Sequence, residues 1–194
     1  MYSIIMQGRR CALAHMQEEY LTLHTAYMND PEVNRFIRSR PPFSIEQQRE
    51  WLWERARAGD RVYAVLALDH TGTGEQFTFV GVMDFHNTDW EHHTAHSASV
   101  IGDKRYWRKG IAREARLMQL KIGFDELHFH WIFSETVRAN VRSQRLFEST
   151  GYELFTVLPQ ARSVEGTLQD ELRYRVSRAL WLPHWERYCG GAET

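Results

Sequence analysis

The stretch Trp107-Arg108-Lys109-Gly110-Ile111-Ala112-Arg113-Glu114-Ala115 decides the fold of this chain. It follows an apolar run, Ser97 to Ile101, and it opens a helical pattern. The first N–H groups of a helix lack internal partners and carry the positive end of the helix dipole, so they attract anions. Gly110 lets the backbone approach an anion closely, and the loop's cations add charge. The pattern indicates a diphosphate site, although a capped helix with surface cations would read the same way.

No complete nucleotide motif is present in this loop. A P-loop would need Gly-Lys-Ser/Thr after four spacer residues, and the dinucleotide fingerprint would need a second and third glycine. A second segment, Asn140 to Tyr152, narrows the choice. Asn140 is a good N-cap with Ser143 one turn later, Phe147 lies on the apolar face, and Gly151 ends the helix. An ordinary capped helix between two strands explains that spacing equally well.

Taken together, the two segments resemble the acetyl-coenzyme A signature of the GNAT acetyltransferase superfamily. Three other stretches resemble its branch of ribosomal-protein N-terminal acetyltransferases and their small-molecule relatives. They are Asn29-Asp30-Pro31-Glu32-Val33, Tyr106-Trp107 before the glycine loop, and Gly166 to Tyr174 with Asp170. The resemblance implies acetyl transfer from acetyl-CoA to a primary amine, on a small molecule or a protein N-terminus, by direct attack in a ternary complex.

Composition agrees with one enzyme domain spanning 1–194, with a core of about 8–180 and a short C-terminal extension, 181–194. The chain has 194 residues, 43% of them hydrophobic, and a net charge of −1. We therefore expect neither nucleic acid nor membrane as a partner. The two cysteines, Cys11 and Cys189, lie near opposite ends, which favours a reduced, cytoplasmic setting. No apolar run approaches a membrane span, no signal peptide is evident, and a homodimer is left open.

The fold class we expect is α/β (α+β), a GNAT-like mixed, mostly antiparallel twisted sheet of about six or seven strands with helices on both faces. Strands are expected at 9–15, 62–68, 77–85, 93–101, 129–135, 152–158 and 170–178, with a turn at Gly72 and Gly74. Helices are expected at 17–28, 44–58, from 111 onward, 140–150 and 181–188. Ser44 with Gln47 reads as a capping box. Ile111, Ala115, Met118 and Ile122 recur at helical spacing and should form a buried face.

The resemblance assigns the cofactor contacts. The backbone of Ser99, Val100 and Ile101 would pair with the pantetheine amides where that strand splays from its neighbour, and Asn140 would reach the pantetheine arm or the thioester region. The remaining candidates for binding coenzyme A are Arg108, Lys109, Gly110, Ile111, Ala112, Arg113, Arg145 and Phe147.

The catalytic residues are less closely specified. His96 stands where many relatives carry a glutamate, and an imidazole can accept a proton near neutral pH. We expect His96 to be the base, although the same sequence pattern fits a half-buried structural histidine that is bonded to a neighbour. Asp84 and Glu91 could bind or deprotonate a cationic amine, or could be plain surface charges. The family's frequent tyrosine acid is replaced by Phe147, which leaves the Ser143 hydroxyl as a substitute whose other role is helix capping.

No metal is expected. His86, His92, His93 and His96 cluster in the sequence, but His92 and His93 would point to opposite sides of a strand, and neither cysteine nor carboxylate completes a ligand pattern. His128 and His130 would share one face of another strand, where helix packing explains them.

The acceptor pocket should lie between the N-terminal helices and the far strands. Arg35, Arg38 and Arg40 crowd one segment and could recognise an anionic acceptor, such as an amino acid, a nucleotide-linked amino sugar or a peptide N-terminus. A polyamine or aminoglycoside would instead need the acidic residues Asp84, Asp89 and Glu91. The other class of function left open is a catalytically degenerate CoA-binding sensor or interaction module.

Overall fold

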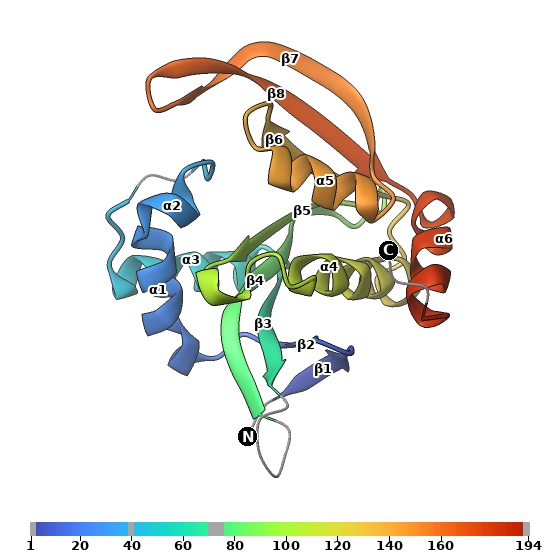
Figure 1. Cartoon of the computed structure of the whole chain (residues 1–194), viewed down its shortest axis with the longest axis horizontal. Coiled ribbons are helices and arrows are strands. Elements are labelled where there is room, and N and C mark those ends of the chain that lie inside the picture. The colour runs from blue at the N-terminus through green and yellow to red at the C-terminus, as the bar shows by residue number, and fades with distance from the viewer. Residues whose placement is uncertain (1–2, 39–40, 70–75, 192–194) are drawn as a thin grey trace.

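One twisted sheet forms the centre of the computed structural model, which describes residues 3–38, 41–69 and 76–191 (Figure 1). Its order is β1-β2-β3-β4-β5-β6-β8-β7, and β5–β6 is the one parallel pair among the described strands. The strands are β1 (Ile4–Gln7), β2 (Cys11–His15), β3 (Arg61–Asp69), β4 (Gln76–Asp89), β5 (Thr94–Ile101), β6 (Trp131–Val137), β7 (Glu153–Val164) and β8 (Thr167–Val176). The mixed, mostly antiparallel class expected from the sequence is confirmed.

The count of about six or seven strands was wrong by one, because the sequence analysis began the sheet at residue 9. The additional strand is β1, an edge strand that pairs only with β2 and contains an irregularity between Ile4 and Met6. Its sequence, Ile-Ile-Met-Gln, lacks the apolar–polar alternation that marks a half-buried strand. Tertiary pairing, and not local pattern, therefore specifies β1.

The described helices begin and end close to their sequence signals. They are α1 (Leu21–Asn29), α2 (Pro31–Asn34), α3 (Ile45–Arg57), α4 (Ile111–Lys121), α5 (Val141–Ser149) and α6 (Arg178–Cys189), with short 3-10 turns η1 (Glu18–Tyr20) and η2 (Lys104–Tyr106) and a π turn η3 (Ile122–Glu126). Ser44 and Gln47 form the expected capping box of α3. None of the helices in the described ranges is long and apolar enough to span a bilayer.

Helices cover both faces of the sheet, so there are two cores. On one face, α4 buries Ile111, Ala115, Met118 and Ile122 against β-strand side chains, as the helical spacing predicts. On the other face, α1 and η1 cover a smaller cluster, in which Tyr20 stacks on Phe79 with ring centroids 4.7 Å apart. Because side chains alternate along a strand, β4 and β5 present residues to both layers.

The C-terminal helix belongs to the larger core. Trp181 of α6 is fully buried there, stacks on Trp185 and contacts Phe124. Helix α6 thus packs into the larger core through Trp181 and Tyr188. The sequence placed the helix but not its role, because its apolar residues follow no single stripe.

Two histidine expectations change in the structure. His92 and His93 lie in the β4–β5 turn, not on a strand, and His93 has a left-handed φ of 52°. His128 and His130 precede β6 and are not strand residues; the His130 ring meets that of His93 edge-on. No cluster of three or more potential metal ligands occurs among the described residues. Gly72 and Gly74 fall outside the described ranges.

Candidate functional site

The sheet opens between its two parallel strands. β5 and β6 pair only at Thr94–Trp131, Ala95–Ile132 and His96–Phe133. On its other side β5 stays paired with β4 as far as Ile101. Beyond His96, the edge of β5 that faces β6 has no strand partner among the described residues. Backbone groups of alternate strand residues face the same edge, and the Val100 carbonyl lies against Gly81 of β4, so the groups of Ser99 are among those on the open edge and can receive an extended ligand that carries amides.

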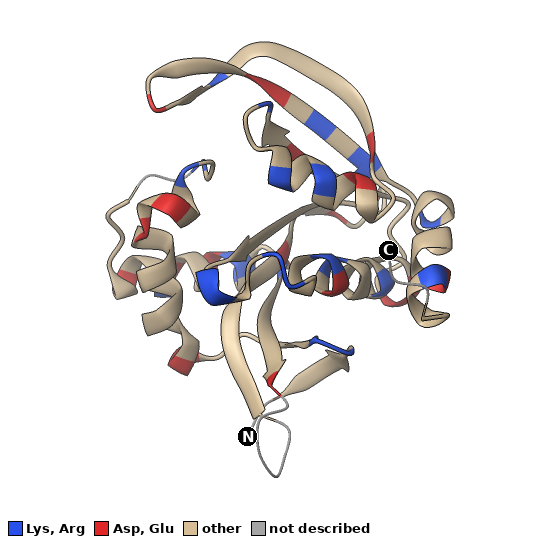
Figure 2. Ribbon diagram, viewed as in Figure 1, with Lys and Arg blue, Asp and Glu red and all other residues tan. Residues whose placement is uncertain are grey.

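A cationic helix N-terminus adjoins this open edge. Gly110 precedes α4 with φ 77°, a left-handed conformation that favours glycine, and leaves the first amides of the helix facing outward. The Trp107 indole Nε1 donates to the Ile101 carbonyl at 2.7 Å, which holds the loop against the end of β5. In Figure 2, Lys and Arg positions are coloured blue along this loop and on α5.

The charges of this loop are available to an anion. Arg108 and Lys109 are exposed and Arg113 is half-buried, and in the part of the chain that the structure describes no carboxylate lies within ion-pair distance of any of them. Unpaired cations, outward amides and an open strand edge fit a coenzyme with a diphosphate at one end and an amide-containing arm at the other. Ile111 is buried in the core and Ala112 half-buried, so their backbones are the parts that could contact such a ligand.

The start of α5 lies beside the same loop. The Arg142 guanidinium stacks 4.5 Å from the centroid of the Trp107 ring. Asn140 caps α5 by accepting from the Ser143 amide at 3.3 Å, and its Nδ2 donates to the Ser143 hydroxyl at 2.9 Å. Asn140 and Ser143 therefore have a structural role in capping, whatever they do for a ligand. Arg145 is exposed on the same helix, whereas Phe147 is buried against Tyr152 and Tyr174.

A histidine–carboxylate pair stands at the mouth of the opening. His96 Nδ1 lies 3.3 Å from Oε2 of Glu135, which β6 supplies. The hydrogen bond with His96 holds the pKa of the Glu135 carboxyl below its usual range, the charges of His96, Arg38 and His86 act in the same direction, and burial opposes them. An ionised Glu135 accepting from Nδ1–H fixes the tautomer whose Nε2 lone pair is free. That is the arrangement a general base needs.

A second polar pair extends the first along β4. Asp84 Oδ1 lies 2.6 Å from His86 Nδ1, and the His86 and His96 rings are 5.7 Å apart. Asp84 is buried, and its backbone carbonyl accepts from the Gln119 amide at 2.7 Å. Because its carboxylate is bonded to His86, Asp84 lies behind the mouth of the site and not on its open surface.

Arginines line the far wall. Glu171 of β8 is buried and accepts from three guanidinium groups: Arg38 at 3.1 Å, Arg162 at 3.4 Å and Arg173 at 2.9 Å. Between this wall and His96 lies a cavity of about 200 Å³. It is lined by His96, Phe133, Ser134, Glu135, Phe155, Arg173 and Tyr174. A small acceptor could thus reach the histidine from this side of the sheet.

The remaining candidates lie apart from this cluster. Arg35 forms an exposed ion pair with Glu165 at 2.8 Å, joining α2 to the β7–β8 turn. Glu91 sits in the β4–β5 turn, toward the closed end of the β5–β6 pair. Arg40 lies outside the described residues.

Sequence reasoning missed Glu135 and Glu171. Both are acidic residues within strands that otherwise read as buried, and a carboxylate inside an apolar strand is a usable signal because it needs a partner. Tertiary pairing supplied the partners, His96 from another strand and three arginines from separate segments.

The mixed sheet that opens between two parallel strands, with a cationic helix N-terminus beside the opening, is an arrangement that suits the binding of a coenzyme. Residues 10–153 match the family model described as "Acetyltransferase (GNAT) domain". The chain therefore belongs to the GNAT acetyltransferase family, it is an acetyltransferase, and acetyl-CoA is its co-substrate.

Relatives and solved structures agree with this assignment. An N-acetyltransferase of Bacillus licheniformis, p20, itself uncharacterized, is 24% identical over 169 residues, covering 83% of this chain and 89% of the relative. Spermidine N-acetyltransferase from Vibrio cholerae, crystallised with CoA and spermine, has a TM-score of 0.78 at 18% identity over 89% of this chain and 98% of that one. A GNAT acetyltransferase from Bacillus anthracis has a TM-score of 0.73 at 22% identity, covering 91% and 98%.

Proposed function

We propose that this chain transfers the acetyl group of acetyl-CoA to the primary amine of a small molecule or a protein N-terminus, by direct attack in a ternary complex, with His96 as the base. The observation that carries the proposal is the His96–Glu135 pair at the mouth of the β5–β6 opening. The base lies where the open strand edge begins, so an amine at His96 adjoins the end of a ligand held along Ser99 and Val100.

Different residues would hold the two parts of the co-substrate. The α4 N-terminus with Arg108, Lys109 and Arg113 would take the diphosphate. The free edge of β5 from Ser99 to Ile101 would take the amide-containing arm. The bound coenzyme supplies an activated thioester, and the protein then has to orient the amine and remove its proton.

His96 performs that second task. A lysine-like amine is protonated at neutral pH, with a pKa of about 10.4, and cannot attack until it loses a proton. Glu135 accepts from Nδ1–H and so leaves Nε2 to take that proton. The imidazolium that results is stabilised by the adjacent carboxylate.

The acceptor proposed here carries an anionic or neutral polar group beside its amine. Beside the cavity, the guanidinium groups of Arg38, Arg162 and Arg173 all bond to Glu171, and the charged residues that line the cavity itself are Arg173 and Glu135. Each of those carboxylates is already bonded, and Asp84 is held by His86. A polyamine would find no free carboxylate in this set, which separates the proposal from the substrate named for the Vibrio cholerae structure.

The test is CoA release from acetyl-CoA with a panel of amines: amino acids, amino sugar nucleotides, N-terminal peptides and polyamines. With the best acceptor, His96→Ala should lower kcat/KM roughly 10²–10⁴-fold. His92→Ala is the matched control, because His92 is exposed in the β4–β5 turn, and it should leave the rate unchanged. An unchanged rate for His96→Ala across pH would eliminate it as the base. Binding of CoA without turnover on any amine would support the sensor or interaction module instead.

Three finer expectations remain predictions. The branch of ribosomal-protein N-terminal acetyltransferases is supported by the turn at residues 29–33, in which Asp30 caps α2 and pairs with Lys104 at 2.7 Å. Acetylation of N-terminal peptides in the panel would test it. We predict a homodimer, which sedimentation would test. We also predict a cytoplasmic location, which localisation in cells would test.

A further inference from the structure

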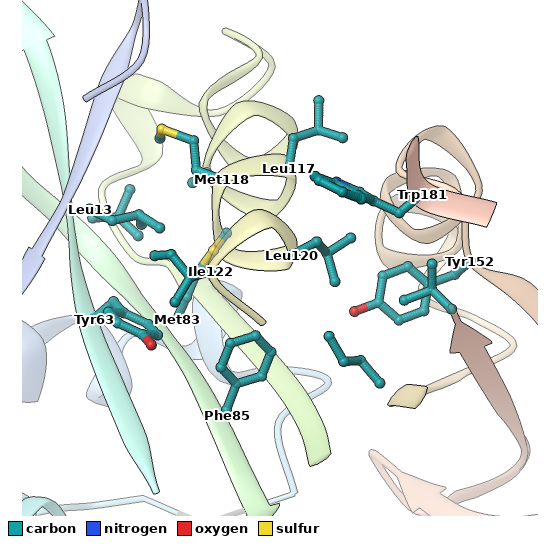
Figure 3. Close-up of a cluster of buried hydrophobic side chains, with 14 of the residues drawn as sticks. Leu13, Tyr63, Met83, Phe85, Leu117, Met118, Leu120, Ile122, Tyr152 and Trp181 are labelled. Atoms are coloured by element: carbon teal, nitrogen blue, oxygen red, sulfur yellow. The ribbon is translucent and has the colours of Figure 1, made fainter. Parts of the chain in front are cut away.

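A fully buried arginine sits beneath the opening of the sheet. Arg116 of α4 is 1% exposed. Its Nη1 donates to the hydroxyls of Ser97 at 2.5 Å and Tyr152 at 3.2 Å, and its Nη2 donates to the hydroxyl of Ser99 at 2.9 Å. Figure 3 shows Tyr152 on this side of the sheet, with its hydroxyl within the core layer beside α4. Arg116 thus faces the point where β5 leaves β6.

None of its partners carries a charge. Across the described residues, no carboxylate lies within ion-pair distance of Arg116, and its buried Nε has no hydrogen-bond partner. The aromatic rings of Phe147 and Tyr152 lie 5.8 Å from its Cζ. Tyr152 is the titratable group that contacts it.

The hydroxyl groups around Arg116 form one connected hydrogen-bond cluster. Ser97 Oγ accepts from Arg116, lies 2.7 Å from the Tyr152 hydroxyl and 2.7 Å from Ser134 Oγ, and Ser134 donates to the Ser97 carbonyl at 2.6 Å. Ser99 Oγ accepts from Arg116, and among the described groups no acceptor takes its hydrogen. Its O–H is therefore available on the β5 strand whose edge is open.

A buried cation without a counter-charge is costly, and natural proteins pair such groups or use them. The geometry of β5 indicates at which step of the reaction an anion would form next to Arg116. The even-numbered β5 residue His96 faces the α1 layer, where the amine enters, whereas Ser97, Ser99 and Arg116 lie on the α4 layer. The nucleophile and its base are on one side of the opening, so the group expelled by the attack is on the other.

We propose that Arg116 and the Ser99 hydroxyl form the site that stabilises the thiolate of CoA as it leaves. In that step the neutral amine nitrogen bonds to the acetyl carbon, the carbon–sulfur bond breaks with its electron pair on sulfur, and the remaining surplus proton of the nitrogen passes to His96, which has by then released to solvent the proton it took from the ammonium. Arg116 supplies positive charge and Ser99 Oγ–H a hydrogen bond. No acid needs to protonate sulfur during the transfer, which accounts for a phenylalanine at position 147.

The experiment needs no acceptor, so it is independent of the proposed base and substrate. Dissociation constants of CoA and of desulfo-CoA are measured by calorimetry between pH 7 and pH 10 on the purified chain. An opposite charge nearby lowers the pKa of an acid by about 1–3 units. For wild type, the affinity for CoA relative to desulfo-CoA should therefore rise about 10-fold or more as the thiol ionises. Thiolate absorbance of bound CoA should likewise appear at a lower pH than that of free CoA.

Three variants test whether Arg116 and Ser99 cause this pH-dependent gain in CoA affinity. Arg116→Met removes the charge at similar volume and should abolish the pH-dependent gain while desulfo-CoA affinity stays level. Arg116→Lys should retain part of the gain, and Ser99→Ala should lose a smaller part. A wild-type ratio that is flat with pH overturns the proposal even if no variant folds. The proposal would also be overturned if Arg116 increased the affinity for succinyl-CoA over acetyl-CoA but gave no pH-dependent gain in affinity for CoA. That result would place the arginine next to the acyl group and not next to the sulfur.

Discussion

Replacing Glu135 by glutamine should slow acetyl transfer by acting through His96. The exchange keeps the side chain's size but removes the charge that accepts from Nδ1 at 3.3 Å. A hydrogen bond to a charged group contributes about 1.5–3 kcal/mol. This one is long, and the side chains of His96 and Glu135 are 37% and 25% exposed, which places it near the lower end. At about 1.4 kcal/mol per factor of ten, kcat/KM should fall about 10-fold.

A double-mutant cycle shows whether the two residues act together. CoA release is followed with the best amine of the panel for wild type, Glu135→Gln, His96→Ala and the double variant. In the His96→Ala background, the Glu135 exchange should change the rate less than about twofold, because the base that it orients is gone. Glu165→Gln, in the exposed pair with Arg35, is the matched control and should change nothing. An equal loss from Glu135→Gln in both backgrounds would refute the coupling.

The remaining predictions concern stability and the coenzyme loop. Burial lowers the pKa of His24 from 6.5 to about 4, so protonation of His24 favours the unfolded chain. The free energy of unfolding should be unaffected by His24 above pH 6.5 and should fall by about 3 kcal/mol as the pH drops toward 4. Urea melts at several pH values should show this fall, and His24→Phe should make the dependence on pH weaker. Trp181→Ala should cost about 3–5 kcal/mol in the same melts, and Trp181→Phe clearly less, since the buried Nε1 has no hydrogen-bond partner; equal costs would contradict this. Gly110→Ala places a side chain at φ 77° and should cost about 1–2 kcal/mol and weaken CoA binding in calorimetry; unaltered affinity would count against the loop as the diphosphate site.

Most of the fold was predictable because its signals are local. The Ser44–Gln47 capping box, the break at Pro31 and the periodic apolar face of α4 all placed elements within a few residues. The long β7–β8 hairpin was predicted too short, since its outer part is mostly exposed and Leu168 there interrupts the polar pattern. Strand β1 depends on tertiary contacts, namely its pairing with β2 and the packing of Ile5 and Met6 against the larger core.

The site was predictable in its parts but not in its connections. A strand, a cationic loop and an Asn140 cap can be recognised along the chain. The contact of His96 with Glu135 joins residues 39 apart, and that of Arg38 with Glu171 joins residues 133 apart. No spacing rule reaches across such separations. Arg116 has the same character, since on a helix its sequence position suggests only a solvent-facing cation.

The burial of Trp181 has a practical consequence for handling the protein. Residues that follow the sheet in sequence complete its larger core, so an expression clone cut at the end of the family match would expose aromatic surface and be expected to aggregate. Affinity tags and fluorescent fusions attached through a spacer after Gly191 leave that layer intact. A library that randomises α6 as if it were dispensable would select variants for folding before it selects them for activity.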